Sequence, residues 1–120
     1  MNARKGLAAA LAKKLGRRYK VIPQPRTIDA IEAGRPVVMV IRTDVQPAAN
    51  AQGTYLNECA VWVIDPSTDN EDALDDALDA VILAIDAYPF VIWTKAERST
   101  YGSNEYNAYR IATTALSQKE

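Results

Sequence analysis

Residues 69–88 constrain the fold of this chain more than any other segment, because their apolar residues recur at steps of three and four. On a helix of 3.6 residues per turn this spacing forms one apolar stripe, which is typical of a helix packed against a sheet. Pro89 cannot continue a helix and ends the pattern. We therefore predict an amphipathic helix over residues 69–88. Its stripe consists of Leu74, Leu78, Val81, Ile82 and Ile85, with Ala77 and Ala84 beside them.

The opposite side of this predicted helix is acidic. It carries Asp72, Asp75, Asp76, Asp79 and Asp86, with Leu83 among them. Asp72 with Asp76, and Asp75 with Asp79, are like charges four residues apart, and each such pair costs about 0.2–0.5 kcal/mol. Two interpretations follow: the face is a solvated surface that keeps the protein soluble, or it contacts a basic surface.

The charge of the chain is polarised along its length. With 120 residues, 48% of them hydrophobic, the chain is long enough for one core, and we predict a single domain over residues 1–120. Residues 1–42 hold ten basic and two acidic residues, a net of +8, whereas residues 43–120 hold four basic and thirteen acidic residues, a net of −9. Such a chain can attract copies of itself, while nucleic-acid binders are more often basic overall.

Cysteine content and hydropathy place further bounds on the protein. Cys59 is the only cysteine, so an internal disulfide cannot form, and a reducing compartment fits. No apolar run approaches the roughly 20 residues that a transmembrane helix needs, so we expect no membrane partner. The short apolar run at residues 6–12 lacks a small-residue cleavage pattern, which argues against a signal peptide.

The remaining segments predict a sheet. Residues 37–43 are almost continuously apolar, which implies burial on both faces at the start of that strand. Residues 44–53 lack apolar periodicity and contain Pro47, Asn50 and Gly53, which is typical of a mobile loop. We predict a helix over residues 2–15, a helical turn within 26–35, and strands over 19–23, 37–43, 54–64, 90–98 and 105–115. This order, α-β-β-β-α-β-β, indicates an α+β fold: a mostly antiparallel sheet of about five strands with two helices packed on one face.

The sequence offers little for catalysis or for a cofactor. It contains no histidine, which excludes Ser-His and Cys-His pairs and imidazole ligands, and its five glycines are dispersed rather than gathered in a phosphate-binding loop. An exposed row of Asp72, Asp76 and Asp79 on one helix lacks the enclosure of a metal site. Cys59 in mid-strand is interpreted as a packing residue rather than a reactive thiol. We therefore predict no catalytic residues, no metal site and no cofactor, and a protein that is not an enzyme.

Aromatic residues in the predicted strands leave one alternative from a different class, a small nucleic-acid-binding module. Trp62, Trp93, Tyr106 and Tyr109 could stack bases on a sheet face. However, strand 54–64 carries no basic residue, and aromatic residues in strands first of all serve packing across strands.

The order of the segments resembles the tail terminator proteins of long-tailed (siphovirus-type) bacteriophages, especially those of actinobacteriophages. The resemblance spans nearly the whole chain. It rests on the N-terminal leucine helix, the segments YKVIP, PVVMVIRTD and ECAVWVIDP, the acidic helix EDALDDALDAVILAI, and the aromatic hairpin FVIWTKAER with YNAYRIATT. These segments carry no signature motif with fixed chemistry, so the resemblance lies in pattern and order.

The resemblance implies a non-enzymatic ring, usually a hexamer, that caps the tail tube, ends its polymerisation and provides the surface for head attachment. The implied partners are copies of itself, the major tail tube protein and head–tail connector proteins, with genomic DNA passing through the lumen without sequence-specific binding. The implied location is the head-proximal end of the virion tail, after assembly in the host cytoplasm. A head–tail connector or tail-completion protein of the neck is an alternative within the same class.

In such rings the sheet lines the channel, the helices face outward, and a hairpin loop reaches toward the lumen or the neighbouring ring. Carried onto this chain, that loop is residues 44–53, with Asp44, Gln46, Pro47, Asn50, Gln52 and Gly53. Separately, a ring contact needs two different complementary patches on one chain. We hypothesise that basic residues Arg4, Lys5, Arg17 and Arg18 contact acidic residues Asp75, Asp76 and Asp79 of a neighbouring copy. Alternatively, both patches are solvated, and strand edges and apolar side chains form the contacts.

Overall fold

The computed structural model describes residues 3–22, 36–47, 54–65, 71–102 and 106–118. It confirms the predicted α+β fold, with two helices and a five-stranded sheet that is mostly antiparallel. The helical turn predicted within residues 26–35 lies outside the described residues. In chain order the elements are α1 (Ala3–Leu15), a short 3₁₀ helix η1 (Gly16–Arg18), β1 (Lys20–Ile22), β2 (Val37–Pro47), β3 (Thr54–Asp65), α2 (Glu71–Asp86), β4 (Val91–Tyr101) and β5 (Tyr106–Gln118).

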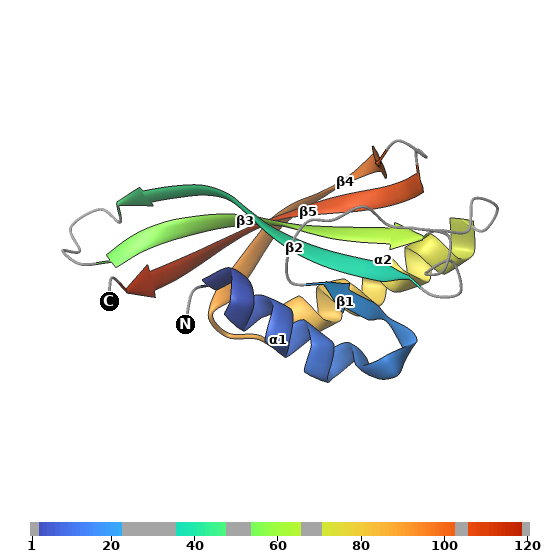
Figure 1. Cartoon of the computed structure of the whole chain (residues 1–120), viewed down its shortest axis with the longest axis horizontal. Helices are drawn as coiled ribbons and strands as arrows, with labels where there is room; N and C mark the ends of the chain where they lie inside the picture. The colour runs from blue at the N-terminus through green and yellow to red at the C-terminus, as the bar shows by residue number, and fades with distance from the viewer. Residues whose placement is uncertain (1–2, 23–35, 48–53, 66–70, 103–105, 119–120) are drawn as a thin grey trace.

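The strands lie in the order β1-β2-β3-β5-β4. β1 pairs with β2 in parallel, and the other three neighbouring pairs are antiparallel. Both helices lie on the same face of the sheet, as the sequence predicted (Figure 1). α1 packs on β1 and β2, and α2 packs beside it on β3 and β4. The helix layer therefore has an α1 side above one edge of the sheet and an α2 side above the other.

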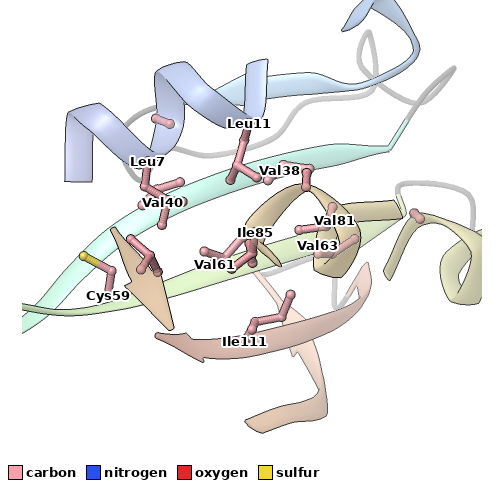
Figure 2. Packing of buried hydrophobic residues seen from close by; sticks show 14 of the residues in the cluster. Leu7, Leu11, Val38, Val40, Cys59, Val61, Val63, Val81, Ile85 and Ile111 are labelled. Atoms are coloured by element: carbon pink, nitrogen blue, oxygen red, sulfur yellow. The ribbon is translucent and has the colours of Figure 1, made fainter. Parts of the chain in front are cut away.

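The helix-covered face of the sheet holds the larger core. Leu7 and Leu11 of α1 point down onto Val38 and Val40 of β2, and Val81 and Ile85 of α2 point toward β3 and β5 (Figure 2). The apolar stripe of α2 is buried at Leu74, Ala77, Val81, Ala84 and Ile85, which confirms the predicted packing. Cys59 is buried in the same core, as expected of a packing residue.

The other face of the sheet holds a second, smaller cluster. Val37, Met39 and Ile64 are fully buried there, with the aromatic side chains of Trp62, Tyr101 and Tyr106 packed against the cluster. The rings of Trp62 and Tyr101 meet edge to face, with their centroids 5.2 Å apart. The predicted burial of the start of β2 on both faces is therefore confirmed.

Two bulges interrupt the ladders at nearly the same level of the sheet. One lies between Arg42 and Asp44 of β2, and the other between Trp93 and Lys95 of β4. At both sites the extra residue is a threonine whose hydroxyl donates to a carbonyl of the neighbouring strand: Thr43 to Glu58 and Thr94 to Ala112. A bulge bends its strand and increases the local twist, which agrees with the strong twist at the middle of the sheet (Figure 1).

The loop predicted at residues 44–53 is wrong in its first part, because residues 44–47 belong to β2 and pair with residues 55–58 of β3. Apolar alternation reveals a strand only where one face is buried, and this part of the ladder is held by backbone hydrogen bonds. β4 and β5 also run three residues farther than predicted, to Tyr101 and Gln118. As a result, the ends of β2, β3 and β5 project beyond the start of α1 (Figure 1).

Candidate functional site

The exposed acidic face lies on α2, where the sequence placed it. Asp72, Asp76 and Asp79 are exposed, and the Leu83 side chain among them is 69% exposed. Asp75 is partly engaged within the chain, because the Tyr109 hydroxyl of β5 donates to its carboxylate at 3.4 Å. Asp75, Asp76 and Asp79 of the predicted acidic patch are thus all exposed, and the carboxylate of Asp75 also accepts a hydrogen bond from β5.

Acidic residues also anchor α2 to the edge strand β4. Both carboxylate oxygens of Glu71 accept from the Arg98 guanidinium, at 2.6 and 2.7 Å, and Arg98 lies over the Tyr109 ring, 5.6 Å from its centroid. At the other end of the helix, the Trp93 indole donates to Asp86 at 3.0 Å. The hydrogen bonds from Arg98 hold the pKa of Glu71 below its ordinary value, and Glu71 in turn raises the pKa of Arg98. The acidic side of the helix layer is thus fixed above β4.

The structure does not bring the predicted basic residues together in one patch. Arg4 and Lys5 lie at the start of α1, whereas Arg17 and Arg18 lie in η1 after its end. At 1.5 Å per residue, α1 separates the two pairs by roughly 20 Å. Between the pairs lie Lys13 and Lys14, in the last turn of α1. Together with Ala10 of α1 and with Ala84, Ala87 and Tyr88, they line a hollow between the two helices.

The predicted lumen-facing loop is described only at its start. Asp44, Gln46 and Pro47 lie in β2, and the Gln46 amide donates to the Asp44 carboxylate at 2.9 Å. Asp44 lies directly opposite Glu58 of β3, so two carboxylates face each other on the ladder. Asn50, Gln52 and Gly53 lie outside the described residues.

An exposed apolar hollow, which the sequence did not single out, lies where α2 leads into β4. Phe90 is 69% exposed and Ile92 is 71% exposed, and the ring of Tyr88 meets that of Phe90 edge to face. The hollow encloses about 400 Å³ and is lined by Leu56, Pro89, Phe90, Ile92, Thr114 and Ala115. Clustered exposed apolar residues of this kind commonly mark interaction surfaces.

Next to this hollow, Asn57 is an unusual buried residue. It pairs with Ala115 in the sheet, and its side chain is fully buried, with no hydrogen-bond partner for the amide nitrogen or oxygen among the residues that the structure describes. Thr113, two residues along β5, contrasts with it, because its buried hydroxyl donates to the Cys59 carbonyl at 2.9 Å. A buried polar group without a partner costs stability, so Asn57 weakens the core at this point.

The structure also shows the surroundings of the residues considered for a reactive thiol, a metal site and base stacking. Burial raises the pKa of the Cys59 thiol, which disfavours the reactive thiolate. Within the described ranges, no three Cys, Asp or Glu side chains group closely enough to hold a metal ion. No helix in the described part of the chain is long and apolar enough to cross a membrane. Of the aromatic residues considered for base stacking, Trp62, Trp93 and Tyr109 each contact another side chain of this chain.

No family model matches this chain, and a search of curated proteins finds no match either. Function is therefore inferred from the arrangement of these surfaces and from the resemblance of the sequence.

Proposed function

We propose that this chain is a tail terminator, a virion structural protein that forms a ring on the head-proximal end of a phage tail tube. The expected ring is a hexamer that ends tube polymerisation and offers the surface for head attachment. Its partners are copies of itself, the major tail tube protein and the head–tail connector proteins. It acts through surfaces, and DNA passes through its lumen without sequence-specific binding.

The observation that carries this proposal is the one-sided layering of the fold. Both helices cover one face of the sheet, and the ends of β2 and β3 extend past them (Figure 1). In a ring with sheets inside and helices outside, this layering directs the β2–β3 hairpin toward the lumen or the neighbouring ring. The charged helix faces and the exposed Phe90 and Ile92 provide surfaces for protein contacts.

The direct test is tube polymerisation in the presence of the purified chain. When the chain is added to polymerising tail tube protein, tubes should stop growing, and electron microscopy should show one ring at one end of each tube. A neck connector or completion protein would instead bind finished tubes or heads without stopping growth. Tubes that elongate equally with and without the chain would contradict the terminator function.

The charge hypothesis has its own test. Reversing Asp76 and Asp79 to Lys should block ring assembly, since it reverses two exposed negative charges of α2. Circular dichroism should show that the variant remains folded, because both side chains are exposed. Rings that form normally on tails would show that this acidic face is only a solvated surface.

A further inference from the structure

The sheet has two open edges within the described residues. β4 is at one end of the strand order, and β5 is its only described strand partner. At the other end, β1 covers β2 only along residues 37–39, so no described strand pairs with the outer side of residues 40–47. An edge strand presents unpaired backbone N–H and C=O groups, which another chain can pair with.

The directions of these two edges are complementary. β2, β3, β5 and β4 pair antiparallel in succession, so β4 runs opposite to β2. When a second copy is placed beside the first in the same orientation, β2 of one copy runs antiparallel to β4 of the other. A head-to-tail contact between copies can therefore continue the antiparallel ladder, and contacts of this type close into a ring when the rotation per copy allows it.

The helix layer favours the same contact by charge. α1 lies above β1 and β2, and α2 lies above β3 and β4. Edge-to-edge pairing then puts the β1 side of α1 of one copy, where Lys5 lines a hollow with Val21, beside α2 of the other, whose exposed face is acidic. A two-fold contact of β4 with β4 would instead bring two acidic helices together. Opposite charges across an interface favour one partner orientation over another.

Charges on the strands select a register. Asp44 and Glu58 lie opposite each other on the face of the sheet that the helices do not cover. Two negative charges directly opposite each other are unfavourable within one chain. Lys95 of β4 points to this same face. It pairs with Ala112 of β5, and the adjacent Ile111 points to the opposite face, into the core beneath the helices. Placing Lys95 of a second copy opposite Asp44 gives an alternating row of charges. Shifting the register by two residues toward the end of β4 puts Glu97 opposite Asp44, a contact of like charges, and shifting it toward the start of β4 removes Lys95 from Asp44.

We propose that copies of this chain join head to tail by pairing residues 40–47 of β2 with β4 of the next copy, with Asp44 opposite Lys95. This contact deepens the ring-forming function proposed above and rests on it. The acidic and basic helix faces then flank the strand contact rather than forming it alone. Lys95, which lies 2.5 Å from Glu97 within its own chain, is shared between Glu97 and the carboxylate of the neighbour.

A cysteine pair tests the contact. The variant combines Asp44→Cys and Lys95→Cys with Cys59→Ala and is oxidised on tail tubes. Within one chain the two positions are separated by β3 and β5, about 14 Å, which is too far for a disulfide. Non-reducing electrophoresis should show a ladder of covalent oligomers that ends at the ring number. The matched control replaces Lys95→Cys by Thr100→Cys, about 17 Å farther along β4, and should give no ladder.

The outcomes separate this contact from the proposed function. A ladder together with tubes that keep growing supports the contact and contradicts the terminator role. Capped tubes without a ladder, or with equal ladders in test and control variants, overturn the contact and leave the terminator role standing.

A charge exchange tests the same contact if the cysteine variants do not fold. Asp44→Lys and Lys95→Glu should each reduce ring formation several-fold, and their combination should restore it. A combination no better than the single changes overturns the proposal.

Discussion

The two halves of β2 differ sharply, although they form one continuous strand. Residues 37–40 are fully buried on both faces of the sheet, whereas residues 42–46 are exposed. The bulge at Thr43 lies near the start of the exposed half. Hydrophobic burial therefore holds the first half, and backbone pairing with β3 holds the second. The core therefore occupies one part of the sheet and leaves another part exposed, so mutations in the two parts should have different consequences for stability.

The largest difference in the loss of unfolding free energy is expected between alanine substitutions at two isoleucines. Ile85 of α2 is fully buried, and Ile92 of β4 is 71% exposed. Ile85→Ala should lower the free energy of unfolding by about 3 kcal/mol, because it removes buried apolar atoms and leaves a cavity. Ile92→Ala should change it by less than about 0.5 kcal/mol. Urea denaturation of both variants measures their free energies of unfolding. Equal losses of this free energy would contradict the distinction between a buried core site and an exposed surface site.

A pair of valines tests the two halves of β2 directly. Val40→Thr introduces a hydroxyl into a fully buried site and should cost about 1–3 kcal/mol. Val45→Thr makes the same change at a side chain that is 45% exposed, and should cost less than about 0.5 kcal/mol. Thermal and urea unfolding of the two variants would show whether the second half contributes more to stability than its exposure implies.

A smaller effect on the free energy of unfolding, an increase instead of a loss, is expected where the two parts of the sheet meet. Asn57→Val should raise the free energy of unfolding by about 1 kcal/mol, because it removes a buried amide without hydrogen bonds. Thr113→Val should lower it by about 1 kcal/mol, since it removes the hydrogen bond to Cys59. If Asn57→Val destabilised the protein, the Asn57 amide would have a stabilising role that its surroundings do not suggest.

The smallest effect concerns the link between α2 and β4. Because the folded pKa of Glu71 is lowered by Arg98, its contribution to stability is present above pH 4.5 and is lost as the pH falls through the lowered pKa. Glu71→Gln should therefore be less stable than the wild type near pH 7, and the two should converge as the solution is acidified. The effect is small because the pair is exposed. Urea titrations from pH 7 to pH 3 measure it, and a difference independent of pH would contradict it.

Much of the fold could be predicted because burial leaves a periodic signal. The stripe of α2 and the continuous apolar start of β2 each identified buried residues correctly. Residues 44–47 escaped prediction because exposed residues such as Asp44 and Gln46 leave no such signal, although their backbones pair. The strand order and the two bulges depend on pairing between distant segments, which one-dimensional periodicity does not encode.

The surfaces were predicted less completely than the fold. The acidic face of α2 followed from helical spacing, because one helix determines which of its side chains share a face. The basic patch did not, since Arg4 and Arg17 lie at opposite ends of α1, roughly 20 Å apart, a separation that the helix predicted over residues 2–15 already implies. The hollow beside Phe90 and Ile92 combines residues from β3, β4, β5 and the turn before β4, so no contiguous segment revealed it.

The length distribution of tail tubes polymerised with increasing amounts of this chain shows whether the chain ends tube growth. A terminator should make the tubes shorter and more uniform as it is added, with a ring visible at one end of each tube. Tubes that grow to the same lengths at every concentration, with bare ends, would contradict it.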